Sequence, residues 1–131
     1  MCQSGHHQRM TMKLLVVDDS ELIRQRLWEL LDFAGIGART SAATLVEALR
    51  FARRDFPTFI LLDLNLPDGN AMSIIATLKS LAPAPQIAVL TNDASALTRS
   101  QCLQAGADWF FDKSTEFNKA IDVVRSQAAL H

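Results

Sequence analysis

The sequence lacks tyrosine altogether, has few cysteines and contains no long apolar run. Its two cysteines, Cys2 and Cys102, provide no disulfide framework, so we expect free thiols and a reducing compartment, the cytoplasm. No apolar stretch approaches the ~20 residues needed to span a membrane, and residues 1–12 lack the apolar core of a signal peptide. These absences predict a soluble cytoplasmic protein without membrane contact.

Neither sign of charge dominates the chain. Thirteen Lys and Arg residues against 14 Asp and Glu residues leave a formal net charge of -1 at pH 7. Binding to nucleic acid without sequence preference requires clustered positive charge, which this chain does not have. We therefore expect no direct nucleic-acid contact.

The length and composition indicate one domain. The chain has 131 residues, of which 49% are hydrophobic and 21% charged, as is typical of a globular domain with a packed core. We expect residues 1–12 to be a disordered N-terminal tail, because they are mostly polar, and residues 13–131 to form the domain.

From Lys13 onward, short apolar runs alternate with longer segments of helical spacing, which predicts successive strand–helix units. Several runs are apolar without alternation, as in parallel strands buried on both faces, so we predict an α/β fold with a parallel sheet. The expected strands are 13–17, 38–42, 58–62, 86–90 and 108–111, and the expected helices lie near 20–34, 44–54, 70–81, 95–105 and 115–129. In the first helix, Asp19 or Ser20 can cap the start and Gly35 follows the end.

Polar side chains follow four of the predicted strands at the points where these strands end. They are, in chain order, Asp18, Asp19, Asp63, Thr91 and Lys113. Because ligands bind outside the carboxyl ends of the strands in open α/β sheets, we expect these side chains to converge on one edge. Three carboxylates at close range repel one another, and one lysine cannot neutralise them all. A divalent cation with oxygen ligands, Mg²⁺ or Mn²⁺, resolves this repulsion.

Asp63 lies before a Pro-Asp-Gly turn and is expected at the exposed end of a strand. A carboxylate there is ionised at neutral pH, so it can attack an electrophilic phosphorus directly and form an acyl phosphate without a general base. The Lys113 ammonium and the Thr91 hydroxyl can then stabilise the phosphoryl oxygens. The residues by themselves thus predict a phosphorylatable aspartate that depends on a divalent cation.

Four segments, LLVVDDS, ILLDLNLPDGN, VLTND and AGADWFFDKS, stand in the order and spacing of one known family. Over about residues 13–129 the sequence resembles the CheY-like receiver domain of bacterial two-component response regulators. The resemblance implies a doubly wound, flavodoxin-like (βα)5 fold, a three-layer α/β sandwich whose parallel sheet has the strand order 2-1-3-4-5.

The resemblance also implies the roles of the acidic residues. Asp63 corresponds to the phosphoacceptor. Asp19 and Asp63 correspond to direct Mg²⁺ ligands, Asp18 to an acidic partner that acts mainly through water, and the Asn65 backbone carbonyl to a further ligand.

By the same resemblance, Thr91 is the hydroxyl that moves onto the phosphoryl group, Lys113 is the ion-pair partner of that group, and Phe110 is the switch aromatic. A sensor histidine kinase or a histidine phosphotransfer protein donates the phosphoryl group in this family. The surface of the fourth helix, fifth strand and fifth helix then repacks to signal to a downstream protein or output domain. The resemblance further implies a monomer, or a weak homodimer that forms through the same surface. The chain is accordingly a signalling domain that catalyses only its own phosphorylation and dephosphorylation.

This sequence departs from the family pattern at a few positions. Ser114 follows Lys113 where most relatives have proline, so we expect no cis peptide there, since a non-proline cis bond costs about 3–4 kcal/mol. Asn92 follows Thr91 where many relatives have a small residue, which can narrow the access of phosphodonors. Asn65 and Asp93 occupy positions that tune dephosphorylation in relatives, and we predict that they orient water and shorten the phosphoryl state.

Three other functions remain open on the sequence. A flavodoxin-like FMN binder shares the predicted fold, but paired aspartates after the first strand repel the FMN phosphate. A haloacid-dehalogenase-type phosphatase needs a second aspartate where this chain has Asn65. The third is a phosphorylation-independent protein-binding module with a receiver-like fold. Whether the chain is a stand-alone regulator or part of a longer regulator or hybrid kinase also stays open.

Overall fold

The computed structural model describes residues 11–32 and 36–130. Most of the predicted tail, and Gly35 at the predicted end of the first helix, lie outside the described residues. Helices and strands alternate along the described chain, as predicted, except that two short additional strands follow the third strand. In chain order the elements are β1 (Met12–Val17), α1 (Glu21–Leu31), β2 (Ile36–Ala42), α2 (Leu45–Asp55), β3 (Phe59–Leu62), β4 (Asn65–Leu66), β5 (Gly69–Asn70), α3 (Met72–Lys79), β6 (Gln86–Thr91), α4 (Ala96–Ala105), β7 (Trp109–Asp112) and α5 (Phe117–Ala129).

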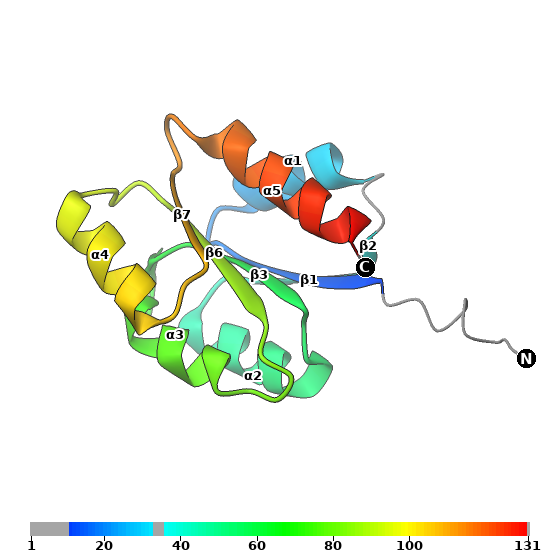
Figure 1. Cartoon of the computed structure of the whole chain (residues 1–131), viewed down its shortest axis with the longest axis horizontal. Helices are drawn as coiled ribbons and strands as arrows, with labels where there is room; N and C mark the ends of the chain where they lie inside the picture. The colour runs from blue at the N-terminus through cyan, green and yellow to red at the C-terminus, as the bar shows by residue number, and fades with distance from the viewer. Residues whose placement is uncertain (1–10, 33–35, 131) are drawn as a thin grey trace, which may run out of the picture.

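The main sheet has five strands in the order β2-β1-β3-β6-β7, and every neighbouring pair is parallel. This order is the predicted 2-1-3-4-5 arrangement, because β6 and β7 are the fourth and fifth strands of this sheet along the chain. Helices α1 and α5 cover one face of the sheet, and α2, α3 and α4 cover the other (Figure 1). The predicted three-layer, doubly wound α/β fold is confirmed.

The apolar runs of the sequence become the buried centre of this sandwich. All four residues of β3 are buried, and their side chains alternate between the two helical layers. Ile60 and Leu62 pack with α2 and α3, whereas Phe59 and Leu61 pack with α1 and α5. A strand buried on both faces has no solvent-facing side, which is why its sequence shows no polar alternation.

Side-chain caps define where three of the helices begin. Ser20 accepts a hydrogen bond from the Ile23 N–H at the start of α1, which selects Ser20 over Asp19 as the cap. Thr44 and Ser95 cap α2 and α4 in the same way. At the other end of α4, Gly106 has a φ of 119°, a left-handed conformation that glycine adopts without steric cost.

The segment after β3 differs from the prediction. The sequence predicted a turn at Pro67-Asp68-Gly69, after which Asn70 leads into a helix near 70–81. Instead, β4 and β5 form a two-stranded antiparallel hairpin around that turn, and α3 begins at Met72. Asn70 lies just before α3, and its side chain accepts a hydrogen bond from the N–H of Met72, the first residue of that helix. Two-residue strands are too short to produce a detectable sequence pattern.

Among residues 11–32 and 36–130, no helix combines the length and the apolar character needed to cross a membrane.

Candidate functional site

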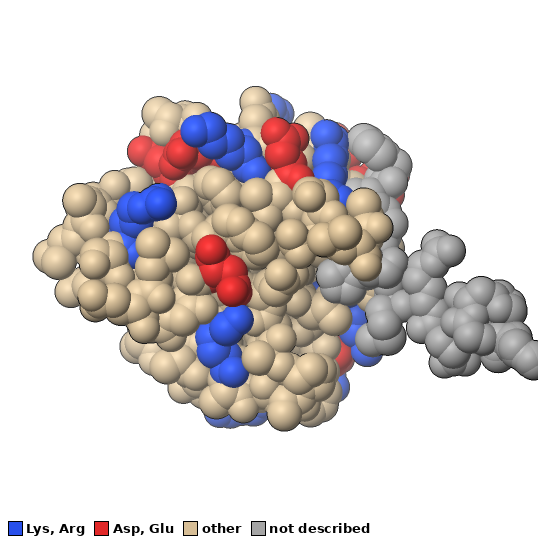
Figure 2. Space-filling model, viewed as in Figure 1, with Lys and Arg blue, Asp and Glu red and all other residues tan. Residues whose placement is uncertain are grey.

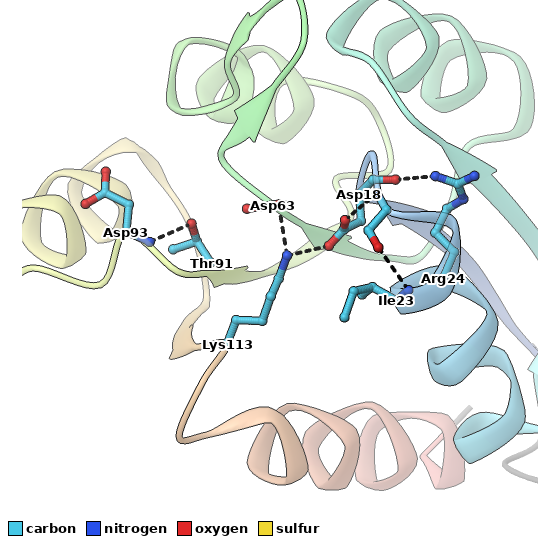
Figure 3. A network of polar contacts seen from close by, with 8 residues as sticks. Asp18, Ile23, Arg24, Asp63, Thr91, Asp93 and Lys113 are labelled. Carbon is cyan, nitrogen blue, oxygen red and sulfur yellow. Dashed lines mark hydrogen bonds and ion pairs between the residues drawn. The ribbon is translucent and has the colours of Figure 1, made fainter.

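The carboxyl ends of four parallel strands bring the predicted residues to one edge of the sheet. Asp18 and Asp19 follow β1, Asp63 follows β3, Thr91 ends β6, and Lys113 follows β7. The backbone extends the sheet into this edge: the Asp63 N–H donates to the Val17 carbonyl, and the Lys113 N–H donates to the Thr91 carbonyl. The side chains of Asp18, Asp63 and Lys113 point toward one another (Figure 3).

Lys113 binds two of the three carboxylates. Its Nζ lies 2.6 Å from Asp18 Oδ2 and 3.0 Å from Asp63 Oδ2. Burial lowers the pKa of the Lys113 ammonium, but the hydrogen bonds to Asp18 and Asp63 outweigh this effect and hold the pKa above its usual value. Lys113 is therefore positively charged at neutral pH, as the predicted role requires.

Asp18 is held at four of its atoms. Its backbone N–H donates to the Ala42 carbonyl at 3.0 Å. Its Oδ1 accepts a hydrogen bond from the Ser20 N–H at 2.9 Å, and its Oδ2 accepts the bond from Lys113. Its backbone carbonyl accepts a hydrogen bond from Arg24 Nη1, on the first turns of α1, at 2.6 Å (Figure 3). Asp18 is thus fixed both through its side chain and through its main chain.

The three carboxylates offer a set of oxygen ligands to a cation. One oxygen from each of Asp18, Asp19 and Asp63 can be chosen so that all three lie within 4.8 Å of one another. Asp18 and Asp63 are only 3% and 8% exposed, whereas Asp19 is exposed. The expectation that Asp63 is exposed is therefore wrong, because it packs against the Lys113 side chain. Hard oxygen donors, with one side open to water, are the chemistry that Mg²⁺ accepts when it also binds phosphate. The residues present fit such a cation.

Thr91 is fully buried, and its hydroxyl oxygen accepts a hydrogen bond from the Asp93 N–H at 3.1 Å. The Asp93 carboxylate points away from Asp63 (Figure 3). Its Oδ1 lies 3.4 Å from the Thr98 hydroxyl, which in turn accepts a hydrogen bond from the Ser95 hydroxyl. The predicted switch hydroxyl is therefore linked through the β6–α4 loop to the first turn of α4.

Phe110, on β7, is 5% exposed and packs in the layer that contains α2, α3 and α4. The Arg99 guanidinium lies 6.0 Å from the centre of its ring and donates to the Phe110 carbonyl. Next to Lys113, the backbone matches the expectation for Ser114: in the described part of the chain, the single cis peptide joins Ala82 and Pro83.

Asn65 lies on β4 and is paired with Asn70 of β5, so the hairpin sets the direction of its backbone carbonyl. The turn of this hairpin is attached to α2. Asp68 accepts hydrogen bonds from the Leu45 N–H at 2.7 Å and the Val46 N–H at 3.1 Å. These bonds stabilise the carboxylate and lower the pKa of Asp68, the bond from Leu45 having the larger effect.

The sequence reasoning missed three contacts around the site, those of Arg24, Asp68 and Thr98. Arg24 lies only six residues after Asp18, near the predicted start of the first helix. This closeness in sequence is the one weak indication that Arg24 lies beside the site. Asp68 and Leu45 are separated by 23 residues, so only the assembled fold brings them together.

The chain matches known proteins along most of its length. Residues 14–125 match the family model of the response regulator receiver domain. The response regulator MprA of Mycobacterium leprae is 31% identical over 88% of this chain and 50% of its own length.

Solved structures are similar as well. A CheY-like receiver domain protein from Methanospirillum hungatei superposes with a TM-score of 0.81 at 25% identity, covering 92% of this chain and 95% of its own. A response regulator from Burkholderia pseudomallei, solved with a phosphorylated aspartic acid, a calcium ion and citrate, has a TM-score of 0.71 at 32% identity. That similarity covers 91% of this chain and 74% of the other.

A doubly wound sheet with acidic, hydroxyl and ammonium groups at its carboxyl edge defines a receiver-type signalling domain. The chain belongs to the family of response regulator receiver domains. It spans about half the length of the curated relatives that it matches, 53% and 56% in two of them.

Proposed function

We propose that Asp63 accepts a phosphoryl group in a reaction that depends on Mg²⁺ or Mn²⁺. The observation that carries this proposal is the convergence of Asp63 with two further carboxylates and with Lys113 at one edge of the sheet. The similarity to a response regulator solved with a phosphorylated aspartic acid supports it.

In the proposed step, a carboxylate oxygen of Asp63 attacks the phosphorus of the donor. A new O–P bond forms, the bond between phosphorus and the donor atom breaks, and the electron pair of that bond leaves with the donor. Asp19, Asp63 and the Asn65 carbonyl, with Asp18 acting mainly through water, would hold a divalent cation that would supply positive charge beside the phosphoryl oxygens.

Residues of the chain supply the remaining stabilisation. The Lys113 ammonium already lies 3.0 Å from Asp63 Oδ2. It is therefore close enough to pair with an oxygen of a phosphoryl group bonded to Asp63. Thr91 provides a hydroxyl that exchanges its contact with the Asp93 N–H for one with the phosphoryl group. Asn65 and Asp93 are proposed to control how fast water removes the group.

The proposed donor is a sensor histidine kinase or a histidine phosphotransfer protein, in the cytoplasm. The proposed output surface is formed by α4, β7 and α5, with Phe110 as its switch residue. In Figure 2 the face of the molecule that carries α4 shows few charged side chains. Leu97 and Leu103 of α4 are 67% and 38% exposed, which suits apolar contact with a downstream protein, an output domain or a second copy of the chain.

Intact-mass spectrometry tests the proposal directly. The protein would be incubated with acetyl phosphate, with and without Mg²⁺, as wild type, as Asp63→Asn and as Asp122→Asn. Asp122 is an exposed carboxylate on α5 and serves as the matched control.

We expect one phosphoryl group to be gained only with Mg²⁺, in wild type and Asp122→Asn but not in Asp63→Asn. Uptake that persists in Asp63→Asn would contradict the assignment of Asp63. Failure of the wild type to gain the group, both from acetyl phosphate and from a phosphorylated histidine donor, would favour a phosphorylation-independent binding module.

A further inference from the structure

The three carboxylates of the cation site are not held equally. Asp18 and Asp63 are both bound by Lys113, and Asp18 also accepts a hydrogen bond from Ser20. The Asp19 carboxylate is exposed and forms no hydrogen bond or ion pair within residues 11–32 and 36–130. Its position therefore depends on the backbone that carries it.

Arg24 controls that backbone. The Arg24 guanidinium donates from Nη1 to the Asp18 carbonyl at 2.6 Å, a short, charge-assisted hydrogen bond in a partly buried position (Figure 3). This carbonyl belongs to the planar peptide unit that also contains the N and Cα atoms of Asp19. Fixing the carbonyl thus fixes the plane from which the Asp19 side chain departs.

Arg24 affects the affinity of the site for a cation in two opposite ways. The guanidinium is a positive charge beside the acidic group, so by charge alone it weakens the binding of a cation. By orienting the peptide before Asp19, it prearranges a ligand and strengthens binding. The opposite signs of the two effects allow one measurement to separate them.

We propose that Arg24 is a positioning residue of the cation site, which orients Asp19 through the Asp18 carbonyl. This inference rests on the proposed function, because it assumes that Asp18, Asp19 and Asp63 bind Mg²⁺. It assigns to Arg24 a role in metal affinity that requires no contact between Arg24 and the metal.

The test is the affinity of the unphosphorylated protein for Mg²⁺, measured by isothermal titration calorimetry. The variants are Arg24→Met, Arg24→Lys and the matched control Arg26→Met. Arg26 lies on the same helix, carries the same charge and is exposed, but its guanidinium lies over the Phe117 ring at 5.8 Å instead of bonding to Asp18.

We expect Arg24→Met to weaken Mg²⁺ binding about tenfold, which corresponds to the loss of one charge-assisted hydrogen bond. Arg24→Lys should recover part of the affinity, because an ammonium can still donate to the carbonyl. Arg26→Met should stay within about twofold of wild type, because exposed charges are screened by solvent. Amide NMR spectra in the absence of Mg²⁺ show whether each variant keeps the fold; if Arg24→Met does not, Arg24→Lys decides through its own loss of affinity relative to wild type.

Binding by Arg24→Met that equals or exceeds that of wild type would overturn the inference, since only the charge effect would then remain. In that case the role proposed for Arg24 fails, but the proposed cation site stands as long as the wild type binds Mg²⁺. Absence of Mg²⁺ binding by the wild type would instead overturn the cation site and this inference with it.

Discussion

Nζ of Lys113 lies 3.0 Å from Oδ2 of Asp63, although the two residues are 50 positions apart in the chain. The contact joins the end of β7 to the end of β3 across β6, so it exists only when the whole sheet is assembled. The site is therefore sensitive to the fold, and the fold is in turn sensitive to the charges gathered in the site.

Replacing Lys113 with Met should destabilise the protein. The change leaves Asp18 and Asp63 close together without their shared ammonium, and breaking a buried ion pair costs about 3–5 kcal/mol. The site opens to solvent on one side, so we expect a smaller loss of about 2 kcal/mol in the free energy of unfolding. Urea denaturation measures this, and added Mg²⁺ should restore part of the loss. The control Lys119→Met removes an exposed lysine and should have no measurable effect; equal stability of both variants would contradict the prediction.

Removing the Asp93 carboxylate should prolong the phosphoryl state of Asp63. If the Asp93 carboxylate turns from Thr98 toward Asp63 and orients the attacking water by one hydrogen bond worth about 1 kcal/mol, Asp93→Ala slows loss of the group about fivefold. Because Thr98 binds Asp93 in the structure, Thr98→Val should also change the lifetime. Mass spectrometry after removal of the phosphodonor follows the decay. Identical lifetimes in the wild type and in Asp93→Ala would exclude a role for this carboxylate.

The contact between Asp68 and α2 should make stability depend on pH. The N–H groups of Leu45 and Val46 lower the pKa of Asp68 below its ordinary value of 3.8. A carboxylate whose pKa is depressed by folding stabilises the folded state fully above the unfolded-state pKa, and this contribution is lost as the pH falls through the folded-state pKa. Wild type should therefore be more stable than Asp68→Asn at about pH 7, and the difference should shrink toward about pH 3. Urea titrations at several pH values test this, and a difference that stays constant or grows on acidification would refute it.

The thiol of Cys102 should react slowly in the folded protein. Cys102 is fully buried on α4, and this burial, followed by the nearby Asp93 charge, raises the pKa of the thiol. In a Cys2→Ser background, we expect modification by a disulfide reagent to be at least about hundredfold slower in native than in denatured protein, because it requires local opening. Rapid modification of the native protein would show that α4 does not remain packed against the sheet.

Much of the architecture was predictable because local patterns and the final fold agree. The apolar runs around Val16, Leu61 and Val89 predicted strands buried on both faces, and these strands form the centre of the sheet. The β4–β5 hairpin was not predicted, because its strands are too short to show a period.

The sequence by itself determined the α/β class and which residues reach the carboxyl edge, because hydrophobic period and strand ends are local properties of the chain. It also placed Asp63, Thr91 and Lys113 among those residues. Only the tertiary structure decided that Lys113 binds two carboxylates, that Arg24 binds the Asp18 carbonyl and that Asp68 binds the start of α2. The physical reason is that hydrogen bonds and ion pairs act over a few ångströms, so their partners are set by how the elements pack, which the periodicity of one segment does not specify.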